Sequence, residues 1–347
     1  MRRSVIVSGG AGYVGSHACK ALAAAGFIPV TLDNLSVGRP DAVRWGPLEI
    51  GDILDSVRVR EVVAAHRPIA VLHFAALALV GESVEDPAPY WQTNVTGTVN
   101  LLDACRSSGV GSFVLSSTCA VYGVPEVMPI RETTPEDPVN PYGATKLAAE
   151  WASAHYCEAY GLKAARLRYF NAAGADPVGE IGETRDRETH LIPLALDAVL
   201  GRRPALKIMG ADYPTKDGTA VRDYVHVSDL ADAHVAALRH LLDGGQSFTA
   251  NLGTGIGHSV QSVVETVERV TGRPVPREVV GRRPGDPPTL VADPSFARRL
   301  LGIDFGLSVS LDDIVETAWR WRSGHERGRS AASVPAVQSA TEARCSP

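Results

Sequence analysis

The chain has 347 residues, of which 45% are hydrophobic and 21% charged, a composition typical of a globular protein long enough for two domains. A net charge of −5 without a dense Lys/Arg run argues against a nucleic-acid partner. There is no apolar run of about 20 residues, and the five cysteines form no CxxC pair. Because residues 1–3 (MRR) lead directly into a predicted strand, we expect no signal peptide. We therefore expect a cytoplasmic protein with reduced thiols and no membrane span.

The first predicted element is a buried strand, residues 4–8 (SVIVS), that runs into a glycine-rich turn and then a helical pattern. Gly10, Gly12 and Gly15 match GxGxxG, and Gly9, Gly12 and Gly15 also match GxxGxxG. Glycines in this context allow a tight turn, close approach of the backbone to a pyrophosphate, and helix–strand packing. The phosphates then lie on the amides of the helix N-terminus. The stretch predicts a dinucleotide site.

A second strand, residues 28–32, leads to Asp33, about 18 residues after Gly15, near the position of the ribose-binding acid in such folds. A carboxylate there accepts hydrogen bonds from both ribose hydroxyls and repels a 2′-phosphate, which favours NAD over NADP. The alternative is an ordinary turn residue at a strand end. After a third strand, Asp52 and Ile53 are expected to contact the adenine.

Two further buried strands should end at the same edge of the sheet. In residues 71–76 (VLHFAA), small side chains would let the backbone approach the cofactor. The strand at residues 112–115 delivers the hydroxyls of Ser116, Ser117 and Thr118, at the place where open α/β sheets bind ligands. A polar turn is the alternative interpretation of this cluster.

Tyr142 and Lys146 are the next feature, four residues apart at the start of a predicted helix. Four residues advance a helix by about one turn, roughly 6 Å, so both side chains leave the same face. A free phenol titrates near about 10, and a fixed cation one turn away is expected to lower that pKa. The pair alone could be a helix N-terminus with a surface lysine. With the glycine turn upstream, Thr118, Tyr142 and Lys146 together predict a catalytic group.

From about Val5 to Trp321 the chain resembles the extended short-chain dehydrogenases/reductases, and within them the UDP-glucose 4-epimerases. Residues 1–170 share their motifs with dehydratases and reductases, so the later motifs discriminate. Related 4,6-dehydratases carry an Asp-Glu pair after the active-site threonine, where this chain has Cys119-Ala120, so the acid/base pair for water elimination is missing. The motifs that carry the resemblance are GGAGYVGSH at 9–17, HFAA at 73–76, VGESV at 80–84, residues 116–123, PYGATK at 141–146, RYFNAAG at 168–174, GEIGE at 179–183, and residues 210–230, 251–255 and 282–286.

The resemblance implies an α/β fold: a Rossmann-type doubly wound parallel sheet with a smaller mixed α/β substrate domain. We expect residues 1–170 to form the NAD-binding Rossmann domain. Residues 171–325 are expected to form the UDP-sugar-binding domain, with a return to the first domain near 224–242. Residues 326–347 are small, polar and aperiodic, which predicts a disordered tail.

The implied activity is NAD-dependent, reversible C4 epimerisation of a UDP-hexose (UDP-galactose/UDP-glucose) through a transient 4-keto sugar. The implied catalytic residues are Thr118, Tyr142 as base, and Lys146, which binds the nicotinamide ribose. The implied cofactor-binding residues are Gly9, Gly12, Tyr13, Val14, Gly15, Asp33, Asn34, Asp52, Ile53, Phe74, Ala75, Ala76, Asn94, Ser116, Tyr142, Lys146 and Tyr169. The implied substrate-binding residues are Thr118, Tyr142, Asn171, His190, Leu191, Lys207, Met209, Arg222, Tyr224, Arg283, Asp286 and Leu290. No metal is expected.

Three positions depart from the family pattern. Leu77-Ala78-Leu79 stands where relatives often have a lysine that touches NAD, which predicts weaker cofactor retention. His190 stands where many have asparagine, and we interpret it as a neutral hydrogen-bond donor. Leu290 occupies the position that admits or excludes an N-acetyl group, and leucine leaves the C2 specificity open.

Two other activities remain open at this point. One is an epimerase for another UDP-sugar (UDP-N-acetylhexosamine, UDP-xylose/arabinose or UDP-glucuronate). The other is an NAD-binding regulator without chemistry, which would typically lose the Tyr142–Lys146 pair. Because the helices near residues 89–106 and 142–160 pair across a twofold axis in relatives, we also expect a homodimer.

Overall fold

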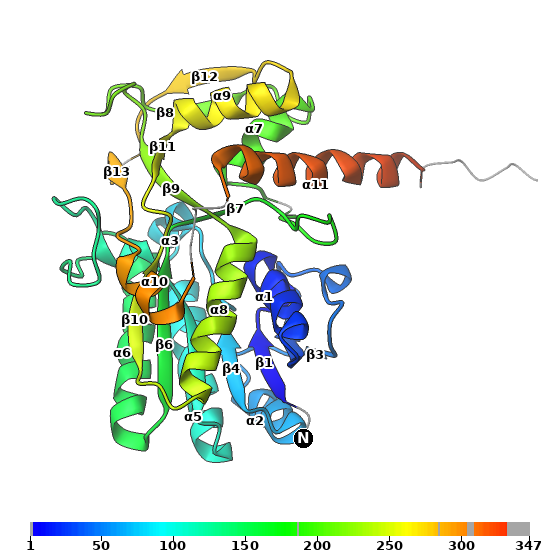
Figure 1. Ribbon diagram of the computed structural model, residues 1–347, viewed down its shortest axis with the longest axis vertical. Helices are drawn as coiled ribbons and strands as arrows, with labels where there is room; N and C mark the ends of the chain where they lie inside the picture. The colour runs from blue at the N-terminus through cyan, green and yellow to red at the C-terminus, as the bar shows by residue number, and fades with distance from the viewer. Residues whose placement is uncertain (1–2, 186, 284, 304–308, 332–347) are drawn as a thin grey trace, which may run out of the picture.

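The computed structural model describes residues 3–185, 187–283, 285–303 and 309–331, and the side chains of 325–331 are not described. A large sheet flanked by helices forms one end of the molecule, and two smaller sheets with their own helices form the other (Figure 1). Among the described residues, no helix is both long and apolar enough to span a bilayer.

The large sheet has seven strands in the order β3-β2-β1-β4-β5-β6-β10, and every neighbouring pair is parallel. The first strand lies in the middle of the sheet; β2 and β3 are added on one side of it, and β4 and the later strands on the other. At this change of side, between β1 and β4, a crevice opens at the carboxyl ends of the strands. The fold class predicted from sequence is confirmed. The strands are β1 (Ser4–Ser8), β2 (Ile28–Asp33), β3 (Leu48–Ile50), β4 (Ala70–His73), β5 (Ser112–Thr118), β6 (Lys163–Tyr169) and β10 (Phe248–Leu252).

Helices cover both faces of this sheet, which explains why its central strands are apolar at nearly every position. Val5 and Val7 of β1 belong to the core on one face, and Ile6 between them belongs to the core on the other. The first face is covered by α1 (Tyr13–Ala24) and α8 (Val227–Leu242), and the second by α2 (Ser56–His66), α5 (Gly97–Ser108) and α6 (Pro141–Tyr160). The connecting segments hold η1 (Pro40–Ala42), α3 (Val80–Glu85), α4 (Ala88–Tyr90), the π-helical η2 (Trp91–Thr96) and η3 (Cys119–Tyr122).

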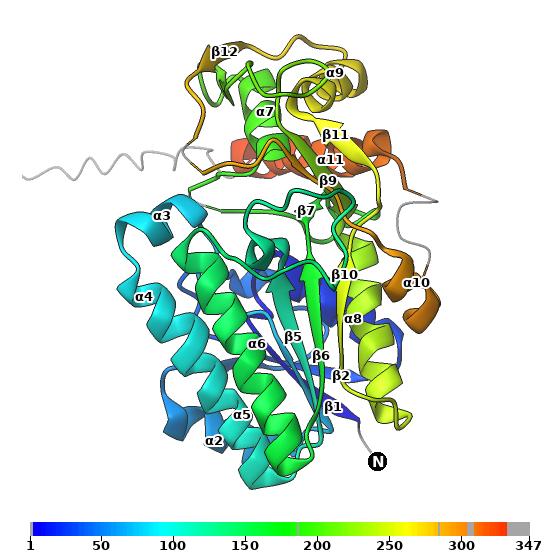
Figure 2. The same cartoon turned by 90° about the vertical axis from the view of Figure 1, so that its left-hand side faces the viewer.

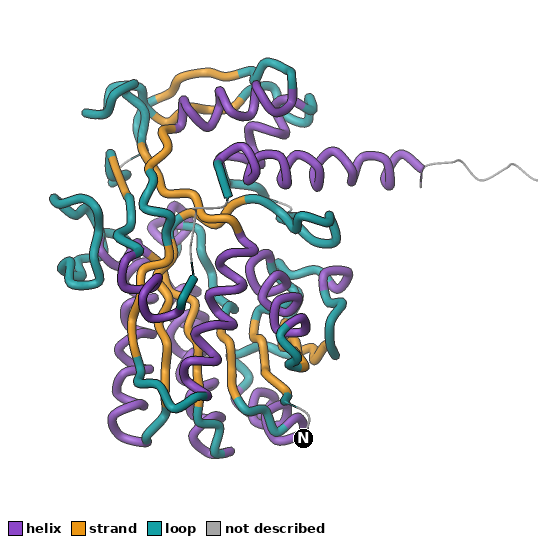
Figure 3. Tube along the Cα trace, viewed as in Figure 1, coloured by secondary structure: helices purple, strands orange, loops and turns teal. Residues whose placement is uncertain are grey.

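The smaller sheets lie beyond the carboxyl ends of the large one (Figures 2 and 3). Strand β9 pairs with β7, β11 and β13, and β8 pairs with β12. Helices α7, α9 and α11 enclose a separate hydrophobic core, whereas α10 packs against the large sheet. The strands are β7 (Asn171–Ala173), β8 (Leu206–Met209), β9 (Val221–His226), β11 (Gly257–Ser259), β12 (Arg277–Val280) and β13 (Thr289–Leu290), and the helices are α7 (Leu191–Val199), α9 (Val260–Thr271), α10 (Ser295–Leu301) and α11 (Leu311–Ala331).

The chain passes between the two ends more than once. The segment predicted to return to the large sheet, residues 224–242, contains α8, which packs against α1, β5 and β6. Strand β10 then extends the large sheet beyond β6, which the sequence analysis did not anticipate. At the C-terminus, α11 includes residues 326–331 of the predicted disordered tail. The rest of that tail, residues 332–347, lies outside the described residues.

Candidate active site

A cavity of about 930 Å³ lies where the two ends of the molecule meet. Its walls come from the carboxyl ends of β1, β2, β4, β5 and β6 and from segments of the smaller sheets. All predicted site residues except Asn94 line this one cavity, although they span the chain from residue 9 to residue 290. The predicted cofactor and substrate residues are therefore brought together.

The glycine turn between β1 and α1 is closed to larger side chains. Gly9 has a φ of +75°, and a Cβ there would lie 2.5 Å from the amide nitrogen of Ala75. A Cβ on Gly15 would lie 2.1 Å from the carbonyl oxygen of Gly9. Because both contacts are with backbone atoms, relief would require the main chain to move. The turn thus keeps the start of α1, at Tyr13, open to the cavity with bare backbone around it.

The acidic residues at the end of β2 and after β3 are held by hydrogen bonds at the cavity wall. Asp33 accepts hydrogen bonds from the backbone nitrogens of Ala11 (3.0 Å) and Leu35 (2.8 Å). Burial raises the pKa of Asp33 above its usual value, and these two bonds counteract part of that effect. Asn34 donates to Asp52 at 2.9 Å, which ties the two strand ends together.

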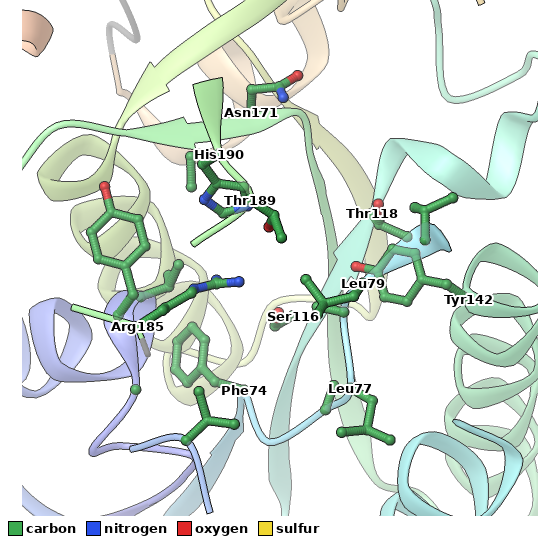
Figure 4. Close-up of a pocket in the computed structure, with 18 of the residues that line it drawn as sticks. Phe74, Leu77, Leu79, Ser116, Thr118, Tyr142, Asn171, Arg185, Thr189 and His190 are labelled. Atoms are coloured by element: carbon green, nitrogen blue, oxygen red, sulfur yellow. The ribbon is translucent and has the colours of Figure 1, made fainter. Parts of the chain in front are cut away.

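The hydroxyls after β5 are fixed by different partners. Ser116 forms a short hydrogen bond with the phenol of Tyr169, at the end of the neighbouring strand β6. Burial raises the pKa of Tyr169 to about 12, so this phenol remains protonated at neutral pH. Thr118 caps the following 3-10 turn by accepting from the backbone nitrogen of Ala120 at 3.1 Å. Figure 4 shows Thr118 beside the ring of Tyr142.

Tyr142 is held at the first turn of α6. Pro141 occupies the start of the helix, and the side chain of Asn140 caps it by accepting from the backbone nitrogen of Gly143 at 2.9 Å. The backbone nitrogen of Tyr142 donates to Ser83 at 3.2 Å. These contacts fix the direction in which the phenol leaves the helix, toward the cavity (Figure 4).

The pKa of Tyr142 differs from the expectation. Burial raises it well above the usual value of a phenol, and the Tyr169 phenol adds to the rise, whereas the Thr118 hydroxyl lowers it. Burial also lowers the pKa of Lys146 to about 8, although Glu150 partly restores it. The Tyr142 pKa is thus raised, whereas the sequence analysis expected the nearby cation to lower it, because desolvation dominates.

Beneath the catalytic helix lies a buried polar network. The carboxylate of Glu150 accepts from Ser117 of β5 and from the Arg168 Nε at 2.9 Å. Arg168 also donates to Tyr122 at 2.9 Å, and Tyr122 donates to Asn251 of β10 at 2.7 Å. Every one of these side chains is buried. The network fastens α6 to three strands of the large sheet.

Arg222 dominates the opposite wall of the cavity. Its Nη2 lies 2.5 Å from Asp286 and 2.8 Å from the carbonyl oxygen of Pro287, and its Nη1 donates to the carbonyl of Val221 at 2.7 Å. Arg283 lines the same cavity from an exposed position in the segment between β12 and β13. The two guanidinium groups offer a wall suited to phosphate oxygens.

His190 precedes α7 and pairs with a buried carboxylate. Its Nδ1 lies 2.7 Å from the Oε1 of Glu183. Burial lowers the pKa of His190, but the Glu183 carboxylate outweighs it, so the pKa is raised overall. In contrast with the neutral donor predicted from sequence, this pairing favours the imidazolium.

Glu183, Glu188 and His190 have donor atoms within 4.8 Å of one another, as in a metal site. However, Arg185 Nε lies 3.1 Å from Glu183, and Arg322 lies 3.4 Å from Glu188. Since these arginines already balance the carboxylates, the cluster is built as an ion-pair group.

Asn94 behaves differently from the prediction. Its side chain is buried in η2, where it donates to the carbonyl of Leu77 at 3.0 Å and to Thr145 at 3.0 Å, and accepts from the backbone nitrogen of Leu77 at 2.9 Å. It therefore fixes the segment after β4 against the catalytic helix, without lining the cavity.

Sequence reasoning missed Arg185 and Thr189, which line the cavity from an aperiodic loop that carries no motif.

Comparison with known proteins identifies the family of the chain. Residues 5–253 match the model of the NAD dependent epimerase/dehydratase family. The chain belongs to this family. A UDP-glucose 4-epimerase of Rhizobium leguminosarum bv. trifolii is 52% identical over 320 residues, which are 92% of this chain and 97% of that relative.

Two solved structures resemble this chain over nearly its whole length. The UDP-glucose 4-epimerase of Brucella ovis in complex with NAD has a TM-score of 0.89 and 52% identity, covering 91% of this chain and 97% of that one. The UDP-glucose 4-epimerase of Bifidobacterium longum in complex with NAD+ and UDP has a TM-score of 0.89 and 34% identity, covering 94% and 99%.

Two observations indicate that NAD, the cofactor of this family, fits the cavity. The glycine turn leaves a backbone cradle that a Cβ would fill, as a pyrophosphate site requires. In addition, Lys146 is buried at the cavity, and Glu150 offsets only part of the burial that lowers its pKa. A ligand that accepts hydrogen bonds from this ammonium is therefore expected there.

Proposed function

We propose that this protein catalyses the NAD-dependent, reversible inversion at C4 of a UDP-hexose, with UDP-galactose and UDP-glucose as the pair. One observation carries the proposal: a single cavity joins a dinucleotide cradle, a Thr–Tyr–Lys group and an arginine-lined wall. The substitution of Cys119-Ala120 for an acidic pair supports epimerisation over water elimination.

The proposed division of labour follows the two ends of the molecule. The large sheet, with Asp33 at the adenosine ribose and Lys146 at the nicotinamide ribose, would hold NAD. The smaller sheets, with Asn171, Arg222 and Arg283, would hold the UDP portion. NAD held there would supply the acceptor, and later the donor, of the hydride exchanged with C4 of the sugar.

The proton is handled by the chain itself. The Tyr142 phenolate takes the C4 hydroxyl proton, directly or through the Thr118 hydroxyl beside it. Because burial raises the pKa of Tyr142, the phenolate depends on positive charge supplied inside the cavity. The Lys146 ammonium lies one helical turn away and would supply such charge, and the oxidised nicotinamide ring would add to it.

The sugar must be held more loosely than the nucleotide. Inversion requires the 4-keto sugar to present its other face, so it turns about a diphosphate that stays anchored. Arg222 is rigidly fixed by Asp286 and Pro287, which suits an anchor. The wall facing the hexose includes Leu79 and Leu290, whose apolar side chains would contact the sugar without directional hydrogen bonds.

The test is product analysis by chromatography after mixing purified protein with UDP-galactose, with and without added NAD. A UDP-glucose peak is expected. A panel of UDP-N-acetylhexosamines, UDP-xylose and UDP-glucuronate, run in parallel, identifies the preferred sugar. Turnover of none of these sugars, with NAD bound, would overturn the proposal.

We further propose a homodimer formed through the helices on one face of the large sheet. Trp151 of α6 and Trp91 of η2 are 55% and 46% exposed, and Tyr160 at the end of α6 is 58% exposed. Large aromatic side chains of this kind are enriched in protein interfaces. Light scattering should give the mass of two chains, and Trp151→Glu should reduce it to one.

A cytoplasmic location is proposed as well. The four described cysteines, Cys19, Cys105, Cys119 and Cys157, form no disulfide with one another. Three of them are buried, as is common for thiols kept reduced. Fractionation of cells that produce the protein would test this location.

A further inference from the structure

Arg185 places a positive charge inside the cavity from a loop that precedes α7. Its side chain is 21% exposed and lines the cavity, and its Nε lies 3.1 Å from the buried carboxylate of Glu183. Figure 4 shows the guanidinium reaching toward the centre of the cavity, above Phe74. No step of the mechanism proposed above uses this residue.

The surroundings of Arg185 belong mainly to the large sheet. Its charge lowers the pKa of three phenols, those of Tyr13, Tyr142 and Tyr169. Tyr13 is the first residue of α1, directly after the glycine turn, and Tyr169 ends β6. Figure 4 shows the guanidinium on the same side of the cavity as Phe74, which follows β4, and Ser116, near the end of β5, so it lies near the carboxyl edge of the large sheet.

Other cations also line the cavity, among them Arg39, Arg44, Lys146 and Arg187, but the segment after β4 adds none. Residues 74–79 (FAALAL), which line the cavity after β4, contain no charged side chain. The N-terminus of α1 contributes only about half an elementary charge. A pyrophosphate brings about two negative charges, so the glycine turn leaves most of that charge unbalanced. The loop before α7 brings two cations to the cavity, Arg185 and Arg187, and Arg185 is the more buried of the two.

We propose that the guanidinium of Arg185 binds the pyrophosphate of the dinucleotide cofactor. The inference rests on the proposed function insofar as that function requires NAD. A planar guanidinium makes two parallel hydrogen bonds to phosphate oxygens, which suits it to this role. Since the loop also carries His190, this contact joins cofactor binding to the substrate end.

The experiment measures NAD binding without turnover. Protein stripped of cofactor is titrated with NAD alone, and separately with UDP alone, by calorimetry. Arg185→Ala should weaken NAD binding roughly 10- to 100-fold, the usual range for a lost charge-assisted hydrogen bond. Its UDP affinity should change by less than about threefold, because UDP is held by the opposite wall. Arg185→Lys keeps the charge and should recover part of the affinity.

Arg320→Ala is the matched control, because it removes the same charge from an exposed side chain that pairs with Glu316 on α11. It should leave both affinities unchanged. Unchanged NAD binding in Arg185→Ala would overturn the inference, as would weaker UDP binding with normal NAD binding. Protein that binds NAD through Arg185 yet turns over no UDP-sugar would refute the proposed function and leave the inference standing.

Discussion

The two walls of the cavity bind through different kinds of structure. At the large sheet, the binding surface near the glycine turn is mostly backbone and leaves no space for side chains. A Cβ added to Gly15 would lie only 2.1 Å from the carbonyl oxygen of Gly9. At the smaller sheets, it is made of long charged side chains, such as Arg222 with Asp286. A cofactor kept through every cycle suits the first surface, and a substrate exchanged in every cycle suits the second. Substitutions at the first wall should therefore impair NAD retention, and substitutions at the second should impair UDP binding.

The largest effect is expected where the walls meet. Tyr142→Phe removes the proton acceptor while keeping the ring that lines the cavity, so turnover should fall about 10²- to 10⁴-fold. NAD and UDP affinities should stay within about threefold of the wild type, since both walls are intact. Steady-state rates and the two titrations measure this. Near-normal turnover would show that another group moves the proton.

Gly15→Ala tests the backbone wall. The added Cβ meets the Gly9 carbonyl, so the turn must move, at a cost of about 1–3 kcal/mol in stability and with loss of NAD retention. UDP affinity should hold. Gly111→Ala is the control, because a Cβ there meets no atom within 4 Å. Thermal unfolding and the NAD content of the purified protein are the measurements, and full NAD content in Gly15→Ala would contradict the comparison.

Arg222→Met tests the side-chain wall. UDP binding should weaken roughly 10- to 100-fold, because one charge-assisted phosphate contact is lost. NAD content should remain at the wild-type level, the reverse of the pattern for Gly15→Ala. If NAD were lost as well, the two walls would not act independently. Arg320→Met serves as the charge-matched control.

His190→Asn should have the smallest effect, visible as a change in how stability depends on pH. The raised pKa of His190 contributes stability that is fully present below about 6.5, the unfolded value, and is lost as the pH rises through the folded pKa. The lowered pKa of Glu183 contributes stability above about 4.3 that is lost as the pH falls through its folded pKa.

The melting temperature of the wild type should therefore exceed that of His190→Asn most between about pH 5 and 6.5, and the gap should narrow by pH 8. Because the His190 side chain is 40% exposed and Arg185 faces the same carboxylate, the gap should correspond to less than about 1 kcal/mol. A gap that is constant with pH would show that the pair does not titrate as described.

The backbone wall could be predicted from sequence more fully than the side-chain wall. Gly9, Gly15 and Asp33 stand at strand ends, and strand ends can be recognised from short apolar runs. Asn171, Arg222 and Arg283 were found only through family motifs, because no local pattern shows that such distant segments share one cavity.

The sequence could not predict how deeply each side chain of the site is buried. The spacing of Tyr142 and Lys146 predicts their shared helix face, but the desolvation that raises the pKa of the phenol depends on what surrounds it. The same holds for Asn94, whose hydrogen bonds are all made inside the protein. Arg185 was missed because its loop has no periodicity, so nothing along the chain indicates where the side chain points.

The buried network around Arg168 has a consequence for the order in which the protein can assemble. Its far end, Asn251, lies in β10, about 80 residues after β6 has been made. Until that strand arrives, Tyr122 lacks one of its partners, and α8 is not yet fully in place over the sheet. A ribosome-bound chain that stops near residue 170 would therefore present an incomplete sheet with an uncovered apolar face. We expect the catalytic helix to be locked late, when synthesis has passed residue 251.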